Sequence, residues 1–231
     1  MPNNGSSIVA GLAYFAGNPS SADLKAFDEP AGTVVIDLSS GALRQKKAAQ
    51  GTNVDGYSDV FTGITNSAAG ATGGQPIDAE LRTYITGSNV AITAGRIAVG
   101  TLLRWRFGMT KTGAGSAAST IDIAFGTAGT TADTARVSFT KPAGTAHADE
   151  GFVEIEATVT AVGATTGVVT GEFRMIHNHA TQGHMTIPAA CVLTTSSAFN
   201  TLTVTDIGLC ITTGASDSIK IGICTVEAIN L

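Results

Sequence analysis

The chain has 231 residues, a formal net charge of −5 and 28 glycines, and charged residues make up only 13% of it. The charged fraction is about half of the ~25% of ordinary soluble domains, which indicates that other subunits cover part of the surface. The negative net charge argues against general nucleic-acid binding, which needs a concentrated basic surface.

Targeting and membrane classes are also disfavoured. Residues 1–5 lack the basic and apolar regions of a secretory signal, and no apolar run approaches the ~20 residues that span a bilayer. We therefore expect no membrane partner. The cysteines Cys191, Cys210 and Cys224 are odd in number and lack metal-like spacing, so we predict small buried or interface residues.

Residues 1–62 contain one clear β-hairpin pattern. Thr33–Ile36 is β-branched throughout, Asp37–Gly41 has the composition of a turn, and Ala42–Lys46 returns as a second strand. A single hairpin is only marginally stable in water. We therefore predict that residues 1–62 form an N-terminal hairpin attachment segment that packs on a partner or on copies of itself.

Residues 63–75 are mostly small and uncharged, which is typical of a flexible linker. From residue 76 to 231, short strand-like segments alternate with turn residues. This spacing predicts an all-β fold, namely an antiparallel β-sandwich of the jelly-roll type. The expected strands are Leu81–Ile85, Asn89–Thr93, Leu102–Met109, Thr120–Phe125, Thr134–Phe139, Gly151–Ala161, Gly167–His177, Ala190–Leu193, Thr201–Thr205, Gly208–Thr212 and Ser218–Ala228.

The pattern is clearest in residues 151–177, where apolar and polar residues alternate on both sides of a short turn. Side chains alternate between the two faces of a strand, so this pattern predicts a half-buried antiparallel hairpin. We place Glu156 opposite Arg174, because a shift by two residues would set it opposite Glu172. The same alternation puts Trp105 on the apolar face of its strand.

The two last strands have unusual faces. One face of each lacks charge, and its residues are Gly208, Cys210 and Thr212 on one strand and Gly222, Cys224 and Val226 on the other. The opposite face of the last strand carries isoleucines, including Ile223. We predict that the uncharged faces point outward as a subunit interface. The alternative is that a loop of the same chain covers them.

The histidines raise the question of a metal. His177 and His179 would point to the same side of a strand, and in a symmetric trimer such pairs could surround an ion on the axis. No cysteine or carboxylate lies at ligand spacing beside them, however. We predict that both histidines are structural, and we expect no cofactor.

Motifs for catalysis are missing. The sequence has no Gly-x-Ser-x-Gly elbow and no phosphate-binding loop. Asp149 and Glu150 are adjacent, so on a strand their side chains diverge and cannot act as a pair on a glycosidic bond. We therefore predict that the chain is not an enzyme.

Two stretches resemble bacteriophage virion surface proteins. In the first, a Gly-Thr strand is followed by an Asp-x-x-x-Gly turn, a strand ending in Gln-Lys, and Gly-Thr-Asn before an aromatic residue. The motif covers residues 32–53 and ends at the aromatic Tyr57, where the family usually has Trp. The second runs from Phe125 through the hairpin of residues 151–177 to Asn178 and is similar to the jelly rolls of these proteins.

The resemblance implies a structural protein on the surface of a tailed-phage capsid, made in the host cytoplasm. It implies a homotrimer that decorates or cements the head and contacts the major capsid protein or another virion protein. The alternative is a tail or head fibre that binds a host receptor, and a particle-borne glycan hydrolase comes third. The attachment residues implied by the first stretch are Thr33, Val35, Asp37, Gly41, Leu43, Gln45 and Tyr57.

Overall fold

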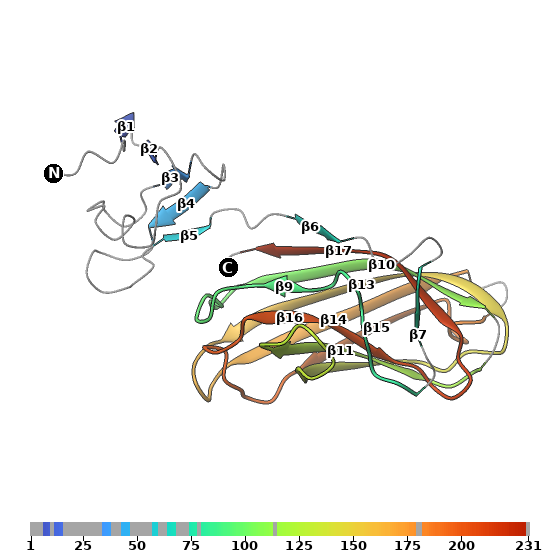
Figure 1. Ribbon diagram of the computed structural model, residues 1–231. Coiled ribbons are helices and arrows are strands. Elements are labelled where there is room, and N and C mark those ends of the chain that lie inside the picture. The colour runs from blue at the N-terminus through green and yellow to red at the C-terminus, as the bar shows by residue number, and fades with distance from the viewer. Residues whose placement is uncertain are drawn as a thin grey trace. The chain divides into compact units, whose positions relative to one another are not determined.

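The computed structural model describes residues 74–77, 80–112, 115–178 and 182–229, together with the strands β1 to β6 nearer the N-terminus (Figure 1). Its contacts divide the chain into two compact units, residues 1–62 with 229–231 and residues 63–228. All the regular structure in the described residues is β-strand, which confirms the predicted all-β class. None of the described residues forms a helix that could span a bilayer.

The first unit contains a five-stranded sheet in the order β1-β2-β3-β4-β5, and its β2 and β3 run parallel. The predicted hairpin corresponds to β3 and β4, which pair antiparallel with Val35 opposite Arg44. The expected attachment residues Val35 and Asp37 therefore lie on β3, Leu43 and Gln45 on β4, and Tyr57 on β5, whereas Thr33 and Gly41 lie outside the described residues. The strands are β1 Ser7–Val9, β2 Leu12–Phe15, β3 Val34–Asp37, β4 Leu43–Lys46 and β5 Tyr57–Asp59.

The second unit is an antiparallel β-sandwich. Its large sheet has the order β15-β14-β13-β10-β17-β6, with β7 also paired to β17, and its small sheet has the order β12-β11-β16-β8, with β9 also paired to β16. The large sheet comprises β6 Ile64–Ser67, β7 Gln75–Ile77, β10 Leu102–Thr112, β13 Ala148–Ala161, β14 Val168–His177, β15 Ala189–Thr195 and β17 Ile219–Ile229. The small sheet comprises β8 Thr83–Tyr84, β9 Val90–Ala91, β11 Ser119–Gly126, β12 Thr134–Lys141 and β16 Asp206–Thr212.

The strand pairs are nested within one another in the sequence. The consecutive strands β13 and β14 pair with each other, while β11 pairs with β16 and β10 neighbours β17, so earlier strands meet progressively later ones. Strand β12, at the edge of the small sheet, packs near β15, at the edge of the large one. This nesting agrees with the jelly-roll-like arrangement predicted from the sequence.

The core fills the space between the two sheets. Trp105 is completely buried, as predicted, and its Nε1 donates a 2.7 Å hydrogen bond to the carbonyl of Ser88. Phe139 of the small sheet stacks on Phe173 of the large sheet with ring centroids 6.0 Å apart. Gly171 makes this approach possible, because a Cβ there would lie 2.8 Å from Phe139 Cζ.

The predicted register of the β13–β14 hairpin is wrong by two residues. Arg174 lies opposite Glu154, and Glu156 lies opposite Glu172. The two facing glutamates are tolerated because each has its own arginine: Arg104 on β10 lies 2.6 Å from Glu156, and Arg174 lies 2.6 Å from Glu172. Charges on a third strand and along the same strand therefore outweigh the cross-strand repulsion used for the prediction.

Three other expectations need correction. Residues 201–205 form a turn instead of a strand, and Thr201 Oγ1 accepts a hydrogen bond from the Gly163 N–H. The range predicted as a flexible linker contains β6, which pairs with the end of β17. The alternation on β17 shifts by one residue after Gly222, so Ile223 is 66% exposed instead of buried.

Candidate functional site

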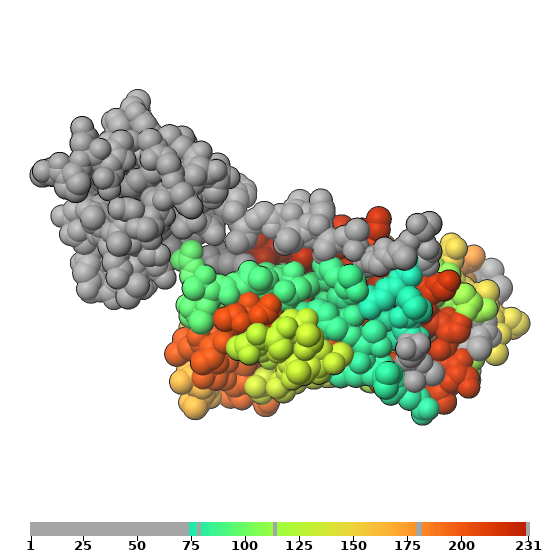
Figure 2. All heavy atoms as spheres, in the orientation of Figure 1, coloured from blue at the N-terminus to red at the C-terminus, as the bar shows by residue number. Residues whose placement is uncertain are grey.

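The faces predicted as a subunit interface are covered by the chain itself. Cys210 on β16 is fully buried, and a Cβ on its neighbour Gly208 would collide with the hydroxyl of Tyr84. Tyr84 belongs to β8, which pairs with β16. Figure 2 shows residues 80–100, in cyan to green, spread over this face of the sandwich. Gly208 and Cys210 therefore lie on the outer face of the small sheet, but residues of the same chain cover them, as the alternative supposed, so this face is not free to be a subunit interface.

The interface prediction also fails on β17. Cys224 and Val226 are fully buried, because the alternation shift after Gly222 turns them into the core. Gly222 is half-buried, and a Cβ there would lie 3.6 Å from the carbonyl of Gly108 on β10. The small residues of the late strands thus serve packing inside one chain.

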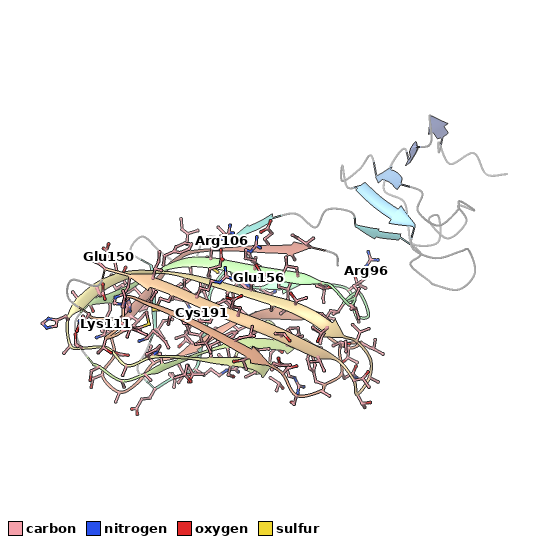
Figure 3. The ribbon with its side chains drawn as sticks, turned by 180° about the vertical axis from the view of Figure 1, so that it is seen from behind. Arg96, Arg106, Lys111, Glu150, Glu156 and Cys191 are labelled. Carbon is pink, nitrogen blue, oxygen red and sulfur yellow. The ribbon has the colours of Figure 1, made fainter. Side chains whose placement is uncertain are left out.

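A cluster of buried ionisable groups lies instead at one end of the sandwich. Lys111 closes the inward alternation of β10, and its cross-strand partner on β13 is Asp149. Its Nζ donates a 2.7 Å hydrogen bond to the Gly115 carbonyl and lies 3.5 Å from Asp217 Oδ1. The side chains of Lys111 and Asp217 are 2% and 0% exposed. Figure 3 shows Lys111 at the same end of the sandwich as Glu150.

A second lysine joins this cluster from the small sheet. Lys141 Nζ donates hydrogen bonds to the carbonyls of His184, at 2.7 Å, and of Pro142, at 2.9 Å. Burial lowers the pKa of Lys141 to about 8, the nearby Asp217 raises it, and Lys111 lowers it further. Two lysines therefore surround one buried carboxylate, and neither oxygen of Asp217 accepts a hydrogen bond from the described residues.

The two histidines of the cluster are held by hydrogen bonds. His177 Nδ1 lies 2.6 Å from Asp149 Oδ2, and the backbone N–H of His184 donates to the same oxygen at 2.9 Å. Burial raises the pKa of Asp149, but the hydrogen bonds from His184 and His177 outweigh burial, so the net shift is downward. His184 Nε2 lies 2.9 Å from the Met109 carbonyl, and burial lowers the pKa of His184 to about 4.

These contacts agree with the structural role predicted for His177, while His179 lies outside the described residues. The described residues contain no group of three or more His, Cys, Asp or Glu side chains that could hold a metal ion. The prediction missed Lys111, Lys141 and Asp217. Its expected strands stopped at Met109 and Phe139, although the next inward position of each strand is a lysine. A lysine that continues an apolar alternation was the available signal.

The outer face of the large sheet carries a second feature, which we call the ion-pair ladder (Figure 3). Its three Arg and four Glu side chains project from β10, β13, β14 and β17 and pair with one another. The shortest pairs, each at 2.6 Å, are Arg104–Glu156, Arg106–Glu154 and Arg174–Glu172; Arg104–Glu227 at 3.2 Å and Arg174–Glu154 at 3.5 Å complete it. Cys191 also donates to Glu172, a bond that raises the pKa of this exposed thiol and disfavours its reactive thiolate.

Beside the ladder runs an exposed apolar row formed by Ile176, Phe152 and Ile223. Phe152 lies between Ile176 and Gly108 in the sheet register, and Gly108 adjoins Gly222, the residue before Ile223. The exposed fractions are 45% for Phe152, 61% for Ile176 and 66% for Ile223. A Cβ on Gly108 would meet nothing within 4 Å, so the row is open at its centre.

Comparisons with known proteins give no family. No protein-family profile matches the chain, and no curated protein matches it. Among solved structures, the alginate lyase Aly36B is similar over 93% of both chains, with 12% identity and a TM-score of 0.31. A mutant of this lyase in complex with alginate trisaccharide gives 10% identity and a TM-score of 0.26 over 92% of this chain and 93% of the other. Similarity at this level carries no argument about function.

Proposed function

We propose that this chain is a structural protein of a tailed-phage particle. Its leading role is that of a capsid decoration, or cement, protein on the virion surface, assembled as a homotrimer. The runner-up is a head or tail fibre component that binds a host receptor. The resemblance of residues 32–53 and 125–178 to virion surface proteins motivates the class, and the β-sandwich with a separate N-terminal unit is compatible with it.

The observation that best supports an oligomer is the exposed apolar row. Phe152, Ile176 and Ile223 are large, exposed and aligned across neighbouring strands, whereas single exposed apolar residues are ordinary on a protein surface. The adjacent ladder pairs its positive and negative charges within the chain, so it presents no strong field of one sign to a charged partner. The same apolar row on the two other copies of a trimer, with the three rows meeting around the three-fold axis, is the occupant that this face suits best. The interface is thus proposed on the large sheet instead of on the late-strand faces.

A non-catalytic role has support of its own among the described residues. The buried cluster around Lys111 and Asp217 is closed to solvent, so a polymeric substrate has no access to it. The exposed Cys191 thiol has a raised pKa. The proposed partners are therefore other copies of the chain and a capsid protein, the latter through the strands β3 to β5, which carry Val35, Asp37, Leu43, Gln45 and Tyr57.

The interface is tested by adding one charge to the row. Gly108→Lys places an ammonium between Phe152 and Ile223 without removing any side chain, and its Cβ meets no neighbour. We expect the wild type to be a trimer by light scattering and the variant to be a monomer with an unchanged circular dichroism spectrum. Thr195→Lys is the control, because it adds the same charge to the same face at β15, beyond the ladder. A trimer that survives Gly108→Lys would exclude this interface.

The role on the particle is tested by counting copies. A quantitative gel of purified virions should show the chain in numbers comparable to the major capsid protein if it is a cement. A few copies per particle would favour the fibre instead, and absence from the particle would refute the proposal.

A further inference from the structure

The buried pair of Lys111 and Asp217 joins two strands that are far apart in the sequence. Lys111 lies near the end of β10, and Asp217 lies just before β17, which is the neighbour of β10 in the large sheet. The Thr112 N–H donates a 3.0 Å hydrogen bond to the Ser218 carbonyl, which fixes the two backbones beside the pair. The amine nitrogen is thereby held 3.5 Å from a carboxylate oxygen, with 2% and 0% of the two side chains exposed.

As an ion pair, this arrangement is poorly stabilised. Both Asp217 oxygens are buried and accept no hydrogen bond from the described residues, whereas Lys111 Nζ donates at 2.7 Å to the Gly115 carbonyl and not to Asp217. A buried charge is costly unless it is paired and hydrogen-bonded with good geometry. Replacing the ammonium and the carboxylate by a neutral amide would remove both charges and leave one N–H to donate to Gly115.

We propose that Lys111 and Asp217 condense into an intramolecular isopeptide bond that links β10 to the start of β17. The Nζ lone pair attacks Cγ of Asp217, an N–C bond forms, and one C–O bond of the carboxyl group breaks. Two of the three ammonium protons end on the departing oxygen, which leaves as water. Ammonium plus carboxylate thus give amide plus water, so charge and electrons balance without any co-reactant.

In this scheme Asp149 carries the protons. It is the cross-strand partner of Lys111 on β13, and β13 lies on the other side of β10 from β17. His177 and the His184 backbone hold Asp149 Oδ2 in position. The remaining buried amine, Lys141, donates to two backbone carbonyls and stays unmodified in this scheme.

Intact-mass spectrometry of the full-length protein tests the bond. We expect the wild type to be lighter than its sequence mass by one water molecule, and Lys111→Arg and Asp217→Ala to show their sequence masses. Asp217→Asn is the sharpest variant: its condensation releases ammonia, so its product has the same mass as the crosslinked wild type. Asp149→Asn should slow the reaction, leaving unlinked chain in freshly made protein.

Peptide mapping then locates the bond. A tryptic digest should contain a branched peptide that joins residue 111 to residue 217 and is absent from Lys111→Arg. A wild-type mass equal to the sequence mass would overturn the proposal, even if the variants fail to fold. A water loss that maps to Lys141 or to an Asp-Gly step would also overturn it, and a wild-type rate in Asp149→Asn would remove Asp149 from the reaction.

Discussion

Replacing Trp105 should produce one of the largest losses of stability in the sandwich. The side chain is completely buried, and its Nε1 donates to the Ser88 carbonyl at 2.7 Å. Truncating a buried tryptophan to alanine costs about 3–5 kcal/mol, and a buried carbonyl that loses its donor costs about 1–3 kcal/mol. Because the cavity and the orphaned carbonyl overlap, we expect Trp105→Ala to lower the free energy of unfolding by about 4–5 kcal/mol.

Urea unfolding followed by far-ultraviolet circular dichroism is the suitable assay, because the substitution removes the only tryptophan. Trp105→Phe separates the two causes: it keeps much of the apolar volume and loses the hydrogen bond, so its cost should be about 1–3 kcal/mol. Leu193→Ala, at a side chain that is 70% exposed, should change stability by less than about 0.5 kcal/mol. A loss below about 1 kcal/mol for Trp105→Ala would show that the core is not packed around this ring.

Three further predictions concern the cluster and the domain boundary. A chelator should leave the melting temperature unchanged, because the His177 ring is hydrogen-bonded to Asp149 and has a structural role. Stoichiometric zinc or iron in the purified protein would contradict this. Folding lowers the pKa of His184 from 6.5 to about 4, so on acidification the unfolded state binds a proton on this ring first, and the free energy of unfolding falls by about 3 kcal/mol as the pH drops from 6.5 to 4. His184→Gln should flatten this part of the curve of stability against pH, and an equal slope in the variant would refute the role given to His184. A protein starting at Gly63 should keep the melting temperature of the sandwich. One starting at Pro76 should melt lower, because it lacks β6 and the Gln75 side chain, which hydrogen-bonds to the backbone of β8 and of the turn after it. Equal melting temperatures would show that β6 does not stabilise the sandwich.

The sequence predicted those strands whose burial is decided within the strand. The alternation around Trp105 and in residues 151–177 gave the right faces, because one side of these strands packs on the opposite sheet and the other meets solvent. The same reasoning failed for β16, where five consecutive residues are buried because the segment containing Tyr84 covers the outer face. The sequence of β16 alone could not predict that another segment buries its outer face.

The candidate site was harder to predict for a related reason. The register of β13 and β14 depends on Arg104, a residue of a third strand, and the pairing of Lys111 with Asp217 depends on β10 and β17 being neighbours. Neither is local in the sequence. The alternation shift at Gly222, which buries Cys224, has no signature in residue type other than glycine.

The place of β16 and β17 in the sheets bears on how the protein is made. β16 lies between β11 and β8, and β17 lies between β10 and β6, so each sheet is completed from within by a strand that leaves the ribosome after most of the others. Until residues 206–229 emerge, β10 and β11 expose unpaired edges, which are templates for pairing with another chain. Long-range strand pairing is also slow. Crowded synthesis should therefore increase exchange of the β16–β17 segment between nascent copies.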